Sequence, residues 1–174
     1  MSSVRVRAWS TALTAVSVDI PAETYLSALV ALRAPSARKQ LVRLLQHDPQ
    51  DAATSIARFG VPQPVANMVV ALAAADPTLG SLPAILDATI DQAYMAKRGT
   101  ALRIEVPRPL GAAAVRDLVA QLERTLPAPV VIDQQVVPRL IGGARLIVGS
   151  QRIDRSAETR LAELRHAVQA QGAL

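Results

Sequence analysis

Leu140-Ile-Gly-Gly-Ala-Arg-Leu-Ile-Val-Gly-Ser-Gln-Arg-Ile-Asp-Arg-Ser156 decides the fold of the C-terminal part of this 174-residue chain. Arg139–Val148 is a β-type run, Gly149-Ser150 suits a hairpin turn, and Gln151–Ile153 suits a returning strand. Gly142-Gly143 lies inside the run, where glycines mark a bulge, a bend or close backbone approach. A phosphate loop would need a Gly-Lys-Ser/Thr ending that leads into a helix. The stretch therefore predicts a β-hairpin and no nucleotide site.

Strand-like and helical segments flank this hairpin. Upstream, Ala101–Val106 alternates apolar and charged residues as a strand does, Gly111–Leu126 is an amphipathic helix, and Pro129–Ile132 is a second strand. Downstream, Ser156 can cap a final helix. The apolar stripe of that helix comprises Ala157, Leu161, Leu164 and Val168. The pattern predicts a strand, a helix, two or three more strands and a helix.

The apolar residues before Gly99 follow helical spacing instead. Pro64–Ala75 is apolar on nearly every side, which predicts the central and most buried helix. In the first candidate helix, polar residues dilute the pattern, so the number of helices in residues 1–34 is left open. The candidate helices are Arg5–Ala15, Ala22–Ala34, a segment from Ser36 through Leu45, one from Asp48-Pro49 to about Phe59, Pro64–Ala75, and one from Asp76-Pro77-Thr78 to Lys97-Arg98-Gly99.

The change of periodicity near Gly99 predicts two small domains. Residues 1–98 are expected to form an N-terminal helical bundle, and residues 99–174 a C-terminal strand–helix–hairpin–helix domain. The fold class is therefore expected to be α+β, mainly α, with the bundle followed by a small mixed α/β domain.

The composition argues against a catalytic site. The chain has no cysteine, which excludes thiolate chemistry, disulfides and cysteine-based metal sites. Its two histidines, His47 and His166, each stand alone in the sequence, so no nucleophile–base pair or ligand cluster is evident. No apolar run approaches the roughly 20 residues of a membrane-spanning helix. We therefore expect a soluble non-enzyme without cofactor or metal.

A nucleic-acid-binding protein is the alternative interpretation. The chain has a formal net charge of +5, and short strands alternate with helices after Gly99. Against this alternative, residues 99–174 contain no aromatic side chain on which bases could stack. The arginines there are also interleaved with acids, which favours a solvated surface of mixed charge. These arginines are Arg139, Arg145, Arg152, Arg155, Arg160 and Arg165, and the acids are Asp154, Glu158 and Glu163.

The 140–165 segment resembles the C-terminal signature of the ATP synthase delta subunit family, which is related to the mitochondrial oligomycin-sensitivity-conferring protein. That signature combines glycines, an apolar strand, a turn, Ile-Asp-x-Ser and a helix rich in Arg and Leu. Leu82-Pro-x-Ile-Leu86 and the region through Pro109-Leu110 resemble the family's last bundle helix and domain junction. The residues that match the signature are Gly142, Gly143, Gly149, Ile153, Asp154, Ser156, Arg160, Leu161 and Leu164.

The resemblance implies a non-catalytic stator subunit of a rotary proton-translocating ATP synthase, peripheral on the cytoplasmic face of the bacterial membrane. It implies that the N-terminal domain grips alpha-subunit N-termini of the catalytic head and that the C-terminal domain holds the b subunits of the stalk. It also implies no cofactor, no nucleic acid, and membrane association only through the complex. The family's N-terminal bundle normally has six helices, and we expect a shortened or rearranged first pair here.

Two docking hypotheses follow from this role. An exposed apolar strip on Pro64–Ala75 and Leu79–Ala96 is expected to accept a partner helix, because the first segment is more apolar than one core-facing stripe requires. The b-subunit contact is expected on the hairpin and the C-terminal helix, through Leu161, Leu164 and Val168.

Overall fold

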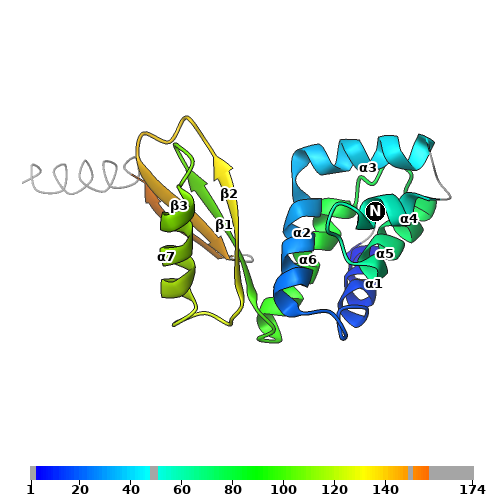
Figure 1. Ribbon diagram of the computed structural model, residues 1–174, viewed down its shortest axis with the longest axis horizontal. Coiled ribbons are helices and arrows are strands. Elements are labelled where there is room, and N and C mark those ends of the chain that lie inside the picture. Colours follow the sequence, from blue (N-terminus) through cyan, green and yellow to red (C-terminus); the bar gives the residue numbers. More distant parts are fainter. Residues whose placement is uncertain (1–2, 48–50, 149–150, 157–174) are drawn as a thin grey trace, which may run out of the picture. The chain divides into compact units, whose positions relative to one another are not determined.

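The computed structural model describes residues 3–47, 51–148 and 151–156. It divides into two compact units (Figure 1). The first contains residues 1–101 and 126–131, and the second contains residues 102–125 and 132–174. The fold is α+β and mainly α, as the sequence predicts, and each unit is described by itself below.

The described part of the first unit contains six helices. Pro62 and Ser81 each precede a helix that has proline in its first turn, where the missing N–H costs nothing. The helices are α1 (Ser3–Ala15), α2 (Ala22–Arg33), α3 (Pro35–His47), α4 (Ala52–Ala57), α5 (Gln63–Ala75) and α6 (Leu82–Met95).

The sequence left open how many helices residues 1–34 contain, and the described part of this segment forms two. Helices α1 and α2 have 13 and 12 residues. The polar residues that dilute the α1 pattern do not break the helix, because the Ser10 and Thr11 hydroxyls donate to Arg7 O in the preceding turn, each at 2.9 Å.

The central helix is α6, not α5, which corrects the second expectation for this unit. Helix α5 buries one stripe only, formed by Val65, Ala66, Val69 and Leu72, and its opposite side is exposed. Helix α6 buries more of its length, with Leu82, Ile85, Leu86, Thr89, Ile90 and Ala93 inside. The additional apolar residues of α5 therefore lie at the surface of the unit and not in its core.

Helix α6 begins at Leu82, later than the predicted start at Asp76-Pro77-Thr78. Residues 76–81 form a turn held by the Asp76 carboxylate, which accepts bonds from Thr78 Oγ1 (2.7 Å), Ser81 N (3.0 Å) and Ser81 Oγ (2.7 Å). These bonds, that from Thr78 foremost, lower the pKa of Asp76 to about 2. At its C-terminal end, α6 stops at Met95, and Lys97 adopts the left-handed conformation with φ 55°. The sequence pattern predicted Gly99 for this terminating position.

The second unit is built around a four-stranded sheet of order β2-β1-β3-β4, with α7 over one face (Figure 1). Strands β1 and β2 are parallel, because Thr100 N donates to Pro129 O and Val137 N donates to Val106 O. The remaining pairs, β1–β3 and β3–β4, are antiparallel. The elements are β1 (Thr100–Val106), α7 (Ala112–Leu122), β2 (Val130–Val136), β3 (Gly143–Val148) and β4 (Gln151–Ser156).

The predicted hairpin is present, but its first strand is shorter than predicted. Strand β3 starts at Gly143 rather than at the predicted Arg139. The φ angle of Gly143 is 78°, which lies outside the strand region. The preceding Leu140 is buried and its N–H closes a turn on Val137 O, so residues 139–142 form a loop. The predicted final helix lies outside the described residues.

The chain passes from α6 into β1 through a junction that requires glycine at position 99. Gly99 has φ +137°, and a Cβ there would lie 2.6 Å from Leu26 Cδ1 and 2.9 Å from Pro129 O. Thr100 also bonds Pro129 O through its N–H and Pro127 O through its hydroxyl. These bonds group residues 126–131 with the helical unit, whereas the sequence-based division assigned them to the C-terminal domain.

We predict that Gly99→Ala lowers the free energy of unfolding of the helical unit by about 1–3 kcal/mol, because the new methyl group overlaps Leu26 and the Pro129 carbonyl. Urea denaturation followed by the fluorescence of Trp9, the single tryptophan, measures this change.

The matched control is Gly111→Ala, since Gly111 has φ −69° and no atom within 4 Å of an added Cβ. This control should change the free energy by about 0.5 kcal/mol or less. Equal effects of the two substitutions would contradict the steric argument.

Candidate docking surface

A polar seam fixes α1 against the central helix α6. Thr14 Oγ1 donates to Gln92 Oε1 at 2.7 Å, and Gln92 Nε2 donates to Ser10 Oγ at 3.0 Å. Both ends of the Gln92 amide are therefore satisfied within the unit, as half-buried amides require. The seam sets the position of α1 along α6.

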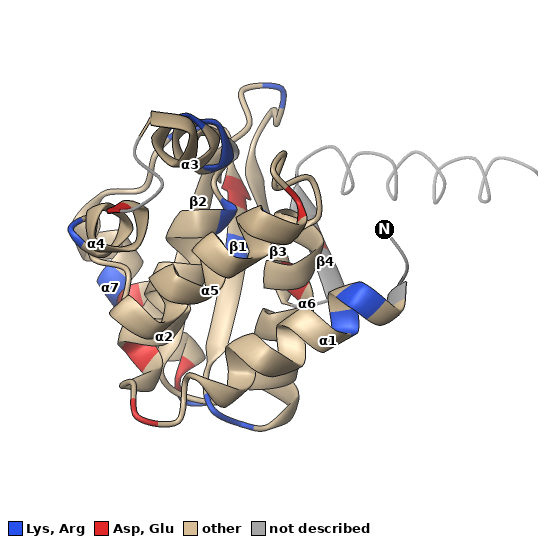
Figure 2. Cartoon of the chain, turned by 90° about the vertical axis from the view of Figure 1, so that its right-hand side faces the viewer, with Lys and Arg blue, Asp and Glu red and all other residues tan. Residues whose placement is uncertain are grey.

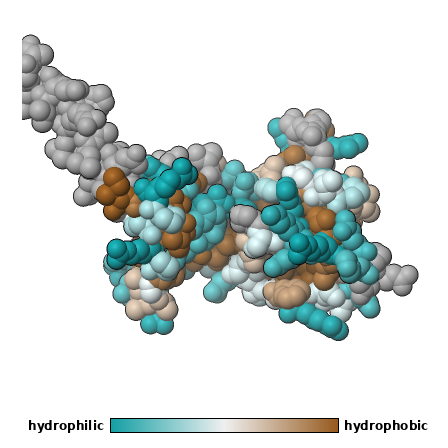
Figure 3. Space-filling view, turned by 90° about the horizontal axis from the view of Figure 1, so that it is seen from above, coloured by the Kyte–Doolittle hydropathy of each residue, from teal (hydrophilic) through white to brown (hydrophobic). Residues whose placement is uncertain are grey.

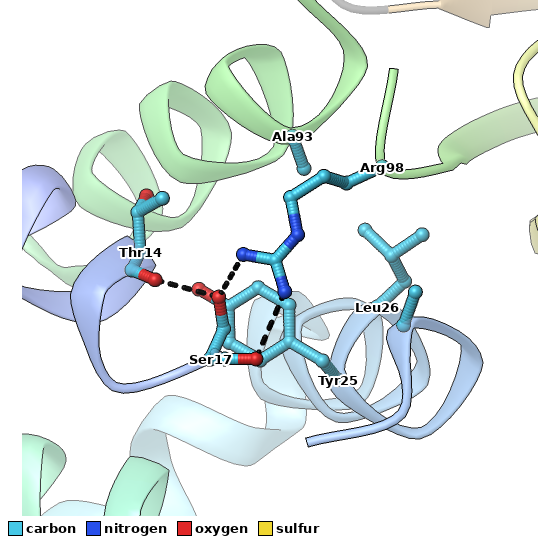
Figure 4. Close-up of a pocket in the computed structure, with 7 residues that line it drawn as sticks. Thr14, Ser17, Tyr25, Leu26, Ala93 and Arg98 are labelled. Atoms are coloured by element: carbon cyan, nitrogen blue, oxygen red, sulfur yellow. Dashed lines mark hydrogen bonds between the residues drawn. The ribbon is translucent and has the colours of Figure 1, made fainter. Parts of the chain in front are cut away.

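A second polar contact closes the bundle where α6 ends (Figure 4). The Arg98 guanidinium donates to Ser17 Oγ at 2.7 Å and to Ser17 O at 2.9 Å. Beside it, Tyr25 OH donates to Leu13 O at 3.0 Å. The cavity between these side chains has about 10 Å³, enough for at most one water molecule. This cluster therefore stabilises the α1–α2 connection and does not bind a ligand.

The first apolar pocket lies between α3 and α5 and has a volume of about 260 Å³. We call it the α3–α5 pocket. On α5 it adjoins the exposed side that carries Ala71 and Ala75. Its lining residues are Val42, Leu45, Gln46, Val70, Ala73, Ala74 and Pro77.

The expected strip does not run continuously along α6 in the described surface. The outward side of this helix carries the exposed Ala84 and Met95 near its ends, with Asp87 and the half-buried Asp91 between them. Arg33 Nη1 lies 2.9 Å from Asp87 Oδ1, and burial, together with the Asp87 charge, raises the pKa of Asp91. An apolar partner helix would gain little on this polar surface. The exposed apolar surface extends from α5 towards α3 instead.

The second apolar pocket lies on the other side of α3, among α2, α3 and α4, and has a volume of about 360 Å³. We call it the Phe59 pocket, because Phe59 lines it while 81% of that residue is exposed. Figure 3, which looks onto α3, shows hydrophobic surface between hydrophilic side chains in the helical unit. The pocket is lined by Ala31, Leu32, Ala37, Gln40, Leu41, Leu44, Ile56, Phe59 and Val61.

Ion pairs cross the strands of the second unit. Arg145 Nε donates to Asp154 Oδ2 at 2.7 Å, and Arg145 Nη1 lies 3.8 Å from Glu105 Oε2. Arg103 Nε donates to Asp133 Oδ2 at 3.1 Å. These arginines therefore face carboxylates of neighbouring strands, which reduces the positive potential that a phosphate backbone would need.

The described signature residues gather around the β3–β4 hairpin. Gly142 lies in the loop just before β3, and Gly143, the first residue of β3, pairs with Ser156 across the strands. Ile153 pairs with Leu146. The remaining signature residues, Gly149, Arg160, Leu161 and Leu164, lie outside the described residues. The signature residue Asp154 accepts a hydrogen bond from Arg145 on the neighbouring strand.

Within the described ranges, no group of three or more His, Asp or Glu side chains could hold a metal ion. In the same part of the chain, no helix is long and apolar enough to cross a membrane. The features that sequence reasoning missed are the two pockets beside α3. The sequence did indicate such pockets, because Leu41, Leu44 and Leu45 are more apolar side chains than a single buried stripe of this helix requires.

Tyr25 provides a test of the cluster at the end of α6. Burial raises its pKa from 10.0 to about 12, against the opposing charge of Arg98. Because the folded pKa is above the unfolded one, this group's contribution to stability is complete below about pH 10 and is lost as the pH rises towards about 12. We predict that tyrosinate absorbance of the folded chain shows a transition near pH 12.

The Tyr25→Phe variant should lack that transition and lose about 1 kcal/mol of stability with the bond to Leu13 O. If Tyr25 in the folded chain titrates at the ordinary pKa of a tyrosine side chain, its hydroxyl is not enclosed.

Comparison with known proteins agrees with this architecture. A family model described as ATP synthase delta (OSCP) subunit matches residues 10–168. The chain is 32% identical over 103 residues to ATP synthase subunit delta of Rhodospirillum centenum, which covers 59% of this chain and 55% of the relative. It is 33% identical over 114 residues to that of Azorhizobium caulinodans, which covers 65% and 60%. The chain thus spans little more than half the length of these relatives.

A solved structure shares the fold. One chain of the Toxoplasma gondii mitochondrial ATP synthase hexamer, determined by cryo-electron microscopy, superposes with a TM-score of 0.57 at 19% identity. The superposition covers 97% of this chain and 98% of that chain. The family match over most of the chain, with the six-helix bundle and the mixed sheet, shows that the chain belongs to the ATP synthase delta (OSCP) subunit family.

Proposed function

We propose that this chain is a non-catalytic stator subunit of the peripheral stalk of a rotary proton-translocating ATP synthase, and that it links the catalytic head to the b-subunit stalk. The helical unit binds N-terminal segments of alpha subunits, and the second unit binds b subunits. The chain is peripheral on the cytoplasmic face of the bacterial membrane and is held there through the complex.

The observation that carries this proposal is the α3–α5 pocket beside the exposed side of α5. An amphipathic helix binds by inserting apolar side chains at successive turns into such a depression. The small residues Ala71 and Ala74 on α5 let a partner helix approach closely, since they project little from the helix surface. No covalent chemistry is needed for this function, because an adaptor acts only by holding two partners together.

The second unit supports the other half of the proposal. Its sheet is stiffened by the Glu105–Arg145–Asp154 contacts across three strands. Opposite charges on neighbouring strands stabilise a sheet modestly, by about 0.2–1 kcal/mol for each pair. The signature residues that follow Ser156 supply apolar positions at helical spacing, which suits an interface with the helices of the stalk.

We predict that Ala74→Asp weakens binding of the chain to its cognate catalytic head by roughly tenfold or more, because a carboxylate would be buried in the apolar α3–α5 contact. Isothermal titration calorimetry at low and high salt measures the affinity. Binding of the unmodified chain should persist at high salt, since apolar contacts dominate it.

The matched control is Ala84→Asp, because Ala84 is exposed in the first turn of α6, where an acid is compatible with the helix. Head binding should be unchanged in this control. If Ala74→Asp binds like the unmodified chain, the head docks elsewhere. If the folded, unmodified chain does not bind the head at all, the stator function is wrong.

Truncation after Ser156 tests the stalk contact. We predict that the truncated chain no longer binds the b subunits but still binds the head, because the removed segment carries Leu161 and Leu164 while the helical unit is intact. Co-sedimentation with purified b subunits and calorimetry with the head measure the two activities. Loss of both would show general unfolding, and retention of both would place the stalk contact outside the C-terminal segment.

A further inference from the structure

The Phe59 pocket is not used by the proposed head contact, although it shares α3 with the α3–α5 pocket. Helix α3 contributes Leu41 and Leu44 to the Phe59 pocket, and Val42 and Leu45 to the α3–α5 pocket. The two residues of each set are three positions apart in the sequence, so they lie on the same side of α3. The two sets are offset by one position, so they project from different sides of the helix. The unit therefore has two separate apolar depressions.

Phe59 is held in an exposed position by local structure. Its N–H bonds Ile56 O and the Gly60 N–H bonds Ala57 O, which closes the end of α4. Gly60 then turns the chain at φ +83°, with no atom within 4 Å of a would-be Cβ. The only phenylalanine of the chain thus remains largely in water, although its burial would be worth on the order of 2 kcal/mol.

The border of the Phe59 pocket is basic. Helix α3 has three Lys and Arg residues and no acid in its sequence, PSARKQLVRLLQH, and Figure 2 marks these basic positions in blue along the ribbon of α3. Arg43 follows the lining residue Gln40 by one turn, and Arg58 precedes Phe59. Both arginines are exposed, and neither has an ion pair with another residue of the described ranges. An occupant with acids beside its apolar side chains would therefore complement this border.

We propose that the Phe59 pocket binds an acidic amphipathic helix of another subunit of the same complex, at a site separate from the α3–α5 pocket. Apolar side chains of that helix fill the pocket against Leu44 and Phe59, and its carboxylates pair with Arg43 and Arg58. This inference rests on the proposed function only in that the partner belongs to the ATP synthase.

Other occupants fit the pocket less well. A small polar ligand would find Gln40 as the one polar side chain among the lining residues, which is too little to orient it. A membrane surface would require the apolar side of α3, but Leu41 is 7% exposed and packs in the core. The chain's own residues 157–174 carry Glu158 and Glu163 balanced by Arg160 and Arg165, so that segment is not acidic.

Site-specific photo-crosslinking tests the proposal. The full chain is prepared with p-benzoylphenylalanine at position 59, 74 or 84 and bound to the cognate ATP synthase from which this subunit has been removed. After irradiation, mass spectrometry identifies the crosslinked peptides. We expect position 59 to crosslink to an acidic helical segment of another subunit, different from the segment reached from position 74.

Charge reversal with Arg43→Glu should reduce the crosslinking yield at position 59 by about fivefold and leave the yield at position 74 unchanged. The proposal is overturned if position 59 crosslinks no more than the control position 84 while position 74 crosslinks well, an outcome that leaves the stator function intact. Crosslinks from position 59 only to lipid or to residues 157–174 also overturn it. Failure at both positions 59 and 74 overturns both docking sites, and the stator function itself is rejected only if the folded chain also does not bind the head in calorimetry.

Discussion

Burial of α6 between its neighbours is the constraint on which the helical unit depends. The helix places Ile85, Leu86 and Ile90 in the core, and the Gln92 amide fixes α1 beside it through Ser10 and Thr14. If α1 shifted along α6 by one turn, the half-buried Gln92 amide would lose both partners, and an unpaired buried amide costs more free energy than one hydrogen bond contributes. The register of α1 on α6 is therefore specific, and α2 and α5 pack against this pair.

The same arrangement leaves α3 at the outside, with apolar side chains on more than one side. Leu41 packs in the core, while Leu44 and Leu45 are half-buried in different pockets. An isolated globular unit would gain by covering such surface, so its exposure favours interaction with other chains. The docking surfaces proposed on α3 and α5 are also separate from α6, whose packing a partner would otherwise disturb.

The second unit depends on backbone pairing and cross-strand charge more than on a large core. Helix α7 has no fully buried side chain, whereas β1 buries Leu102, Ile104 and Val106. The ion pairs of Arg145 connect the signature residue Asp154 with β1 through β3. A sheet held in this way keeps the hairpin in register, and a fixed register presents the end of β4 at a defined place. That property suits the stalk contact proposed for this unit.

Much of the fold could be predicted from the sequence alone. Helical spacing before Gly99, strand alternation in Ala101–Val106 and the pairing of the strands that flank Gly149-Ser150 depend on local periodicity, which the sequence determines directly. The tertiary structure alone decided that α6 rather than α5 is central, that Asp76 forms a turn instead of starting a helix, and that α3 has two pockets. These outcomes depend on which apolar side of a helix finds a neighbour, and a segment's own residues cannot specify that when several of its sides are apolar.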